Sequence, residues 1–248
     1  MRLRARIWLL LAAAVASTGA EAADWYTGAN PPKPDDSWIV TVDASVSITS
    51  NSSRFENLTG TMAVTDTLKE SGARVRIEGL EGSYDYKTTD SSTRVRGQQI
   101  EGSLMGGYEW VWPHATLSAY AGLNVRDNRL SIADPSNPVV GTAVGLKSVL
   151  EFYANPTDLT MVSAYGSYAT DHHAYYARLK GGYALFDRTF VGPEAMLLGD
   201  DFFSQWRIGA HLTGLRVGPL QFGLSAGYVR DRIQKGGVYS VLDVRGSF

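Results

Sequence analysis

The sequence predicts an antiparallel, up-and-down transmembrane β-barrel of about twelve strands that follows a cleaved signal peptide. Three observations predict this fold: an export signal at the start, apolar and polar residues that alternate along much of the remaining chain, and an aromatic residue at the end of a final predicted strand. Successive side chains of a strand point to opposite faces, so this alternation is typical of a sheet with one apolar and one polar face.

The first 22 residues have the composition of a secretory signal peptide. Three arginines (Arg2, Arg4 and Arg6) precede the apolar run 7–16, and Ala20-Glu21-Ala22 matches a cleavage site between small residues. The apolar run is too short to cross a bilayer as a helix, which argues against a membrane anchor. We therefore divide the chain into a signal peptide (1–22), a proline-rich periplasmic leader (23–37) and an outer-membrane barrel (38–248).

The composition excludes several classes of function. Residues 1–22 hold three arginines and one glutamate, so the 23 Lys+Arg and 25 Asp+Glu of the whole chain become 20 and 24, a net charge of −4. This mild acidity argues against nucleic acid as a partner. The chain has no cysteine, which excludes disulfides and thiolate chemistry. No later window has 18 consecutive apolar residues, so no transmembrane helix is predicted.

The first predicted strand shows the clearest alternation. Trp38, Val40, Val42, Ala44, Val46 and Ile48 fall on one face, and Ile39, Thr41, Asp43, Ser45 and Ser47 fall on the other. The run is about 11 residues long, which is enough for a tilted strand to cross a membrane. Further strands are predicted at 54–65, 73–87, 94–112, 116–127, 139–153, 159–170, 174–186, 190–198, 203–217, 220–228 and 238–248.

Proline-containing segments lie on both sides of the strand predicted at 139–153. We interpret residues 134–138 as a loop, because two prolines in five residues forbid a continuous ladder, and residues 155–158 as a turn. Twelve is an even number, which would bring both ends of the barrel domain to the periplasmic side. Counts of ten or fourteen strands stay open.

Aromatic residues gather towards the ends of the predicted strands, as in the interfacial girdles of membrane barrels. They are Trp38, Tyr108, Trp110, Trp112, Tyr153, Tyr168, Tyr183, Trp206, Tyr228 and Phe248. Phe248 also closes a strand with one face of mostly apolar or small residues. Outer-membrane barrels commonly end in this way, so we predict that Phe248 is part of the assembly signal that the barrel-assembly machinery reads.

No catalytic motif stands out. Acyl hydrolases of the outer membrane place a histidine and a serine close together along a strand, but His-x-Ser is absent here. His114-Ala115-Thr116 and His211-Leu212-Thr213 come nearest, with threonine as the weaker nucleophile. We interpret His172-His173 and Asp200-Asp201 as polar loops and predict no metal site. No glycine-rich phosphate loop opens a helix, and no cofactor is expected.

Glu194 is the most informative acidic residue, because it lies inside a predicted strand. A carboxylate that faced lipid there would be costly, so we predict that it faces the lumen. Glu194, Arg207 and His211 are our candidates for a polar network inside the barrel. Arg74 and Arg76 are further candidate partners for Glu194.

An ordered set of short motifs resembles the cellulose biosynthesis protein BcsS family of exported bacterial proteins. The motifs are W-Y-T-G at 25–28, G-S-Y-D-Y at 82–86, L-M-G-G-Y at 104–108, D-P-S-N-P-V-V-G-T-A-V-G-L-K at 134–147, M-V-S-A-Y-G-S-Y at 161–168, G-P-E-A at 192–195, R-I-G-A-H-L-T-G-L at 207–215 and L-S-A-G-Y at 224–228. The polar segment 49–59 shows little to match. The resemblance implies an outer-membrane component associated with cellulose production, and it implies no catalytic site.

These observations predict a non-enzymatic outer-membrane accessory to cellulose biosynthesis or secretion. It would act as a passage, a scaffold or a surface contact for the polymer. Its expected partners are outer-membrane lipid, the barrel-assembly machinery, and cellulose or the cellulose-secretion machinery. Two alternatives stay open: an outer-membrane enzyme that acts on lipid or glycan through His211 or Glu194, and a soluble periplasmic β-sandwich.

Overall fold

A computed structural model describes residues 39–64, 67–88, 93–186, 188–232 and 236–248. The predicted signal peptide, the predicted leader and Trp38 lie outside the described residues. Within these ranges, no helix is both long enough and apolar enough to span a bilayer.

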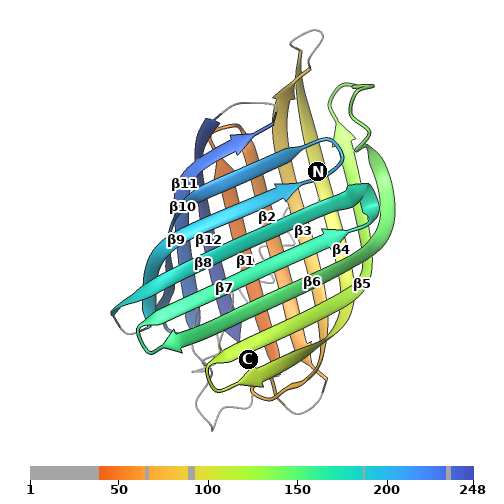
Figure 1. Ribbon diagram of the computed structural model, residues 1–248. Helices are drawn as coiled ribbons and strands as arrows, with labels where there is room; N and C mark the ends of the chain where they lie inside the picture. The colour runs from red at the N-terminus through yellow and green to blue at the C-terminus, as the bar shows by residue number, and fades with distance from the viewer. Residues whose placement is uncertain (1–38, 65–66, 89–92, 187, 233–235) are drawn as a thin grey trace.

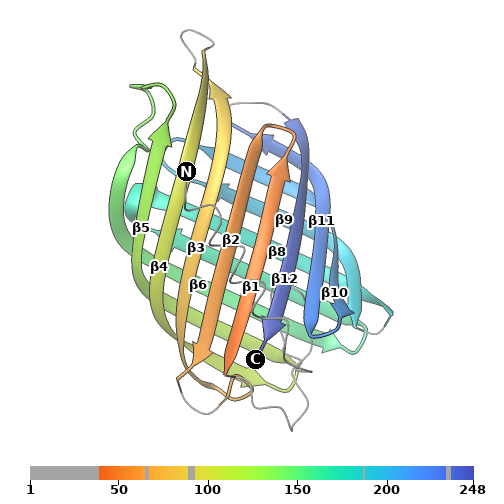
Figure 2. The ribbon, with the colours of Figure 1, turned by 180° about the vertical axis from the view of Figure 1, so that it is seen from behind.

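The described chain forms a closed barrel in which every strand runs antiparallel to both neighbours (Figures 1 and 2). The strands are β1 (Val40–Thr49), β2 (Ser53–Ala63), β3 (Gly72–Lys87), β4 (Arg94–Trp112), β5 (Ala115–Leu130), β6 (Gly141–Thr157), β7 (Thr160–Ala169), β8 (Ala174–Phe186), β9 (Thr189–Gly199), β10 (Ser204–Val217), β11 (Leu220–Asp231) and β12 (Gly236–Ser247). Sequential strands are neighbours, and β1 pairs with β12 from Thr41–Ser247 to Thr49–Tyr239. The predicted barrel of twelve strands is confirmed.

The outer wall of the barrel is apolar. Ile77, Leu104, Leu123 and Leu146 lie opposite one another on β3 to β6 and form a row around the wall. Their side chains are 56–61% exposed. Most side chains at the inward positions next to this row are polar, and Arg76, Glu78 and Asn124 are 2%, 6% and 0% exposed. A sheet that is apolar outside and charged inside is suited to surroundings of lipid.

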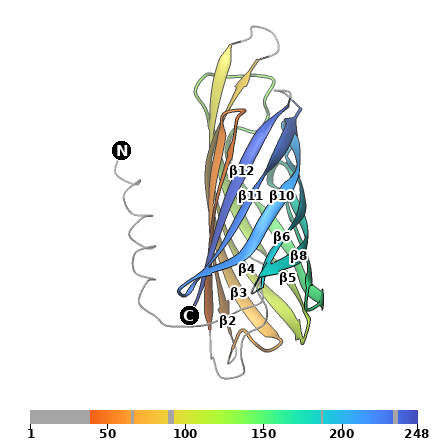
Figure 3. The same ribbon diagram turned by 90° about the vertical axis from the view of Figure 1, so that its left-hand side faces the viewer.

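The two ends of the barrel differ. We call the end where β1 begins and β12 stops the termini end, and the opposite end the loop end. Tight turns at Pro113-His114, Asp158-Leu159 and Gly218-Pro219 close the termini end. Gly218 has a φ of +61°, a conformation that favours glycine. At the loop end, the β3–β4 hairpin extends beyond its neighbours (Figure 3), and residues 131–140 form a long connection.

Exposed aromatic side chains form two girdles. Tyr108, Trp110, Trp112, Tyr183 and Phe186 lie towards the termini end, and Tyr168, Trp206 and Tyr228 lie towards the loop end. Such rings suit the two interfaces of a membrane. Tyr153 was predicted to belong to this set, but it is 1% exposed and faces the lumen.

Two predicted boundaries near prolines are wrong. The strand predicted from Val139 begins at Gly141, because the Asn137 side chain accepts a hydrogen bond from the Val139 N–H and holds it in the loop. The predicted turn at 155–158 is also wrong, because β6 continues to Thr157. Pro156 lies at a shift in register between Ala154 and Thr157, the kind of irregularity that tolerates a residue without an N–H.

Candidate functional site in the barrel lumen

Arg178 is the centre of a buried ion-pair network between β8, β9 and β12. One of its guanidinium nitrogens lies 2.7 Å from a Glu194 oxygen and 3.0 Å from an Asp243 oxygen. Ser225 and Tyr239 donate hydrogen bonds of 2.9 and 3.0 Å to the two Glu194 oxygens. Glu194 is 2% exposed, so its charge is compensated inside the protein and not by water.

The structure places Arg207 and His211 in the same lumen as Glu194, but neither of them is the ion-pair partner of Glu194, which is Arg178. Arg207 donates to Gln205 (2.6 Å) and Ser47 (2.7 Å), and its guanidinium lies 5.3 Å from the centre of the Tyr239 ring. The other two candidate partners pair elsewhere: Arg74 with Glu109 and Arg76 with Glu151. The sequence interpretation missed Arg178. The signal that could have revealed it is a second cation, Lys180, two residues later on the same face of the strand.

His211 completes the hydrogen bonding of an interrupted sheet. The β8–β9 ladder stops at Lys180–Glu194 and resumes at Tyr183–Val191 in the same register. Pro193 lies opposite Gly181 in this register and has no N–H to donate. The Nε2 of His211 lies 3.1 Å from the Gly181 carbonyl oxygen, and the Nδ1 lies 2.8 Å from the Thr213 hydroxyl. Because the carbonyl only accepts, Nε2 donates, and Nδ1 accepts from Thr213.

This arrangement gives His211 a structural role. The Cβ of any residue other than glycine at position 192, opposite His211, would lie 1.9 Å from the Gly181 oxygen, so a glycine is needed there. Thr213 is 0% exposed, and neither a lipid nor a glycan reaches its hydroxyl. The other histidine-threonine motif begins in the exposed turn at His114, and His172 and His173 lie in a short 3-10 segment (η2, Asp171–His173) at the loop end.

A second network of charges crosses the lumen between β3 and β6. Lys147 lies 2.8 Å from Glu78 and 2.9 Å from Glu101, and Arg126 lies 2.8 Å from Glu101. Arg76 extends the network to Glu151 at 2.5 Å. Every one of these cations has a carboxylate partner, so this second network is charged but balanced.

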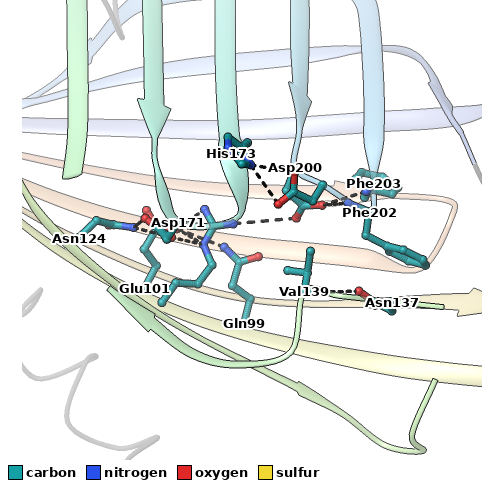
Figure 4. A network of polar contacts seen from close by, with 12 residues as sticks. Gln99, Glu101, Asn124, Asn137, Val139, Asp171, His173, Asp200, Phe202 and Phe203 are labelled. Carbon is teal, nitrogen blue, oxygen red and sulfur yellow. Dashed lines mark hydrogen bonds and ion pairs between the residues drawn. The ribbon is translucent and has the colours of Figure 1, made fainter. Parts of the chain in front are cut away.

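Loop-end segments join this second network. Asp171 turns into the barrel and accepts from Asn124 at 2.9 Å, close to Glu101, as Figure 4 shows. Asp200, from the β9–β10 connection, accepts the backbone N–H groups of Phe202 and Phe203 and lies 3.9 Å from Arg126 on β5. These contacts tie two loop-end turns to the inner wall.

The connection 131–140 is tied to the barrel mouth as well. The Tyr86 hydroxyl donates to Asp134 at 2.8 Å, and Ser136 donates to the same carboxylate through its backbone and its hydroxyl. These hydrogen bonds lower the pKa of Asp134 below its usual value, and the one from the Ser136 hydroxyl has the largest effect. Val139 is 2% exposed and lies beside the network of Figure 4. The loop therefore narrows the entrance.

A cavity of about 230 Å³ lies in the loop-end part of the lumen. It reaches from Ser53 and Phe203 near the turns to Lys147, Arg178 and Val241 on the inner wall. Both ion-pair networks contribute to its lining. The cavity is the place where a ligand would meet the charges described above.

Buried side chains fill the lumen nearer the termini end. Tyr153, Met161 and Phe190 pack together with 1%, 1% and 0% exposure. A second cluster joins Met105, Tyr120 and Val149, and Tyr165 packs against both clusters. Tyr165 also lines the cavity, so the apolar filling begins at the cavity floor.

A family model for the cellulose biosynthesis protein BcsS matches residues 45–248. The chain belongs to the BcsS family. The match includes the polar segment 49–59, where the sequence resemblance was weak, and it leaves the motif at 25–28 outside. No curated protein sequence matches the chain.

Several solved barrels are similar to this BcsS-family chain. The KdgM porin shares 11% identity over 84% of this chain and 99% of its own, with a TM-score of 0.42. The translocator domain of the autotransporter NalP from Neisseria meningitidis shares 12% identity over 99% of this chain and 95% of its own, with a TM-score of 0.45. Omp33 of Acinetobacter baumannii shares 10% identity over 86% of this chain and 99% of its own, with a TM-score of 0.40.

Proposed function

We propose that this BcsS-family barrel lies in the outer membrane of a Gram-negative cell and serves cellulose production without catalysing a reaction. The apolar outer wall and the two aromatic girdles support the membrane location. Short turns and both ends of the barrel domain usually face the periplasm, so the loop end would face outside. The predicted signal peptide would direct the chain there.

The filled termini end of the lumen is the observation that distinguishes among the three non-enzymatic roles, which are a passage, a scaffold and a surface contact. Tyr153, Met161 and Phe190 pack together in the lumen near this end and are almost fully buried, which is expected to leave little room for a polymer. This packing favours a scaffold or a surface contact over a passage. The networks of Arg178 and Lys147 then act as rigid internal braces, because each charge is held by fixed partners on other strands.

The experiment that tests this proposal measures secreted cellulose in the native host. Deletion of the gene is expected to reduce the glucose that cellulase releases from the cell surface. A His211→Gln variant is expected to restore it, because an amide keeps a donor and an acceptor for Gly181 and Thr213. Cellulose levels that do not change on deletion would contradict the proposal.

The same strains test the enzymatic alternative. Lipid A and phospholipid species are compared between the deletion strain, the wild type and the His211→Gln strain, at equal amounts of folded barrel. We expect no difference, because His211 and Thr213 are engaged in the wall and buried. A lipid product that disappears in the His211→Gln strain would favour an enzyme.

A further inference from the structure

We infer that the lumenal cavity binds the end of a neutral, β-linked glucan chain from the loop end. This inference rests on the proposed function and deepens it by naming the ligand that the cavity takes. Three features of the lining carry it: aromatic rings laid flat on the wall, balanced charges, and a closed floor.

The first feature is the row of rings on β2 and β3. Phe55 lies opposite Gly82, and Tyr84 lies opposite Gly97 in the next pair of strands. A Cβ at either glycine would come within 2.3 Å of the facing ring. The two rings therefore lie over the glycines, against the sheet, and both line the cavity. Tyr84 stacks near Tyr86 (6.2 Å between ring centres).

The row continues beyond β3. Phe202, from the β9–β10 connection, lies 5.2 Å from the ring centre of Tyr86 and also lines the cavity. A β-linked glucan is a flat ribbon whose C–H faces are apolar, and such faces pack on aromatic rings. An α-linked chain coils, so it presents fewer such faces to rings that lie against one wall.

The second feature is the charge balance of the cavity wall. Four cations line it, and three of them pair with carboxylates: Lys147 with Glu78, Arg126 with Glu101, and Arg178 with Glu194. Arg207 donates to the neutral amide of Gln205, and the carboxylate of Asp200 also lines the cavity, so four carboxylates accompany the four cations. A site for an anionic polymer needs cationic charge in excess of its own carboxylates. Paired charges together with hydroxyl and amide groups, such as Ser45, Ser167 and Asn57, suit the many hydroxyls of a neutral sugar.

The third feature is the size and depth of the cavity. Its volume of about 230 Å³ is below the ~300–1,000 Å³ of pockets for drug-sized ligands. Tyr165 forms part of the floor, against the apolar filling. The cavity therefore suits a short chain end and not a polymer in transit.

Calorimetric titration of the folded barrel in detergent micelles with cellotetraose tests this inference. We expect saturable binding to one site. Phe55→Ala and Tyr84→Ala are each expected to weaken it about two- to tenfold, because each removes one stacking surface. Tyr183→Ala is the matched control, since this ring is 56% exposed on the outer wall, and it is expected to leave the affinity unchanged. A gel-mobility shift on heating verifies that each variant is folded.

Three results would overturn the inference: no saturable binding to the folded wild type, equal affinity in the two cavity variants, or tighter binding of maltotetraose or of an oligogalacturonate. These results are independent of the cellulose measurement. A deletion strain that loses cellulose while the purified barrel binds no cellotetraose would refute the cavity as a glucan site and leave the accessory role standing. Binding without a cellulose phenotype would refute the accessory role.

Discussion

An Arg178→Met barrel is expected to lose about 3–5 kcal/mol of folding free energy, the cost of leaving a buried charge without its partner. Arg178 is the cation that lies between Glu194 and Asp243, at 2.7 and 3.0 Å, and both carboxylates have 0% side-chain exposure. Methionine fills much of the same volume but leaves two acids facing each other across the lumen. Lys180, 3.5 Å from Asp243 and 3.9 Å from Glu194, is too distant to replace both contacts.

Urea titration of the barrel folded into lipid vesicles measures this loss, with the heat-dependent shift on a gel as the readout of folding. Arg129→Met is the matched control. Arg129 pairs with Asp127 at 2.7 Å, but its side chain is 77% exposed, so its removal is expected to change stability by at most about 1 kcal/mol. Equal urea midpoints for the two variants would show that the Arg178 network does not brace the barrel.

Leu123→Arg is expected to destabilise the barrel in a bilayer by about 2–4 kcal/mol, the cost of a lipid-facing arginine near the midplane. Leu123 lies midway along β5, between Leu104 and Leu146 in the apolar row, and is 60% exposed. In a water-soluble protein, an arginine at so exposed a position would have little effect. The substitution therefore separates a barrel in lipid from a soluble one.

Ile132→Arg serves as the control for this second variant. Ile132 is apolar and 51% exposed, but it lies in the connection between β5 and β6 at the loop end. We expect the Ile132→Arg barrel to fold into vesicles like the wild type. The same urea titration compares the two variants, and no difference between them would place the middle of β5 outside the hydrocarbon.

The sequence predicts the strands of this barrel well because each strand has an apolar outer face and a more polar face towards the lumen. In β1, apolar residues at 40, 42, 44, 46 and 48 alternate with polar residues at 41, 43, 45 and 47 without a break. The errors occur where side-chain hydrogen bonds or prolines replace the ladder. Val139 is apolar enough for a strand, yet Asn137 holds its N–H in the loop.

The polar network is harder to predict than the strands, because partners depend on how far neighbouring strands are offset. Glu194 and Asp243 share Arg178 as their partner although all three are remote from one another in the sequence, and this pairing follows from the register of the closed sheet. Placing Glu194 on an inward face needs only the alternation along β9. Choosing Arg178 over Arg207 needs the positions of the strands. His211 was selected as a polar side chain, but its role depends on the missing N–H of Pro193.

We propose that this BcsS-family barrel spans the membrane with a lumen filled at its termini end. Conductance across a planar lipid bilayer tests this proposal most directly, with insertion verified by protease protection and a general porin reconstituted in parallel. We expect no stepwise current from the inserted wild type, because Tyr153, Met161 and Phe190 fill the termini end. Stable, ohmic current steps would contradict the claim and restore a passage as the function of the lumen.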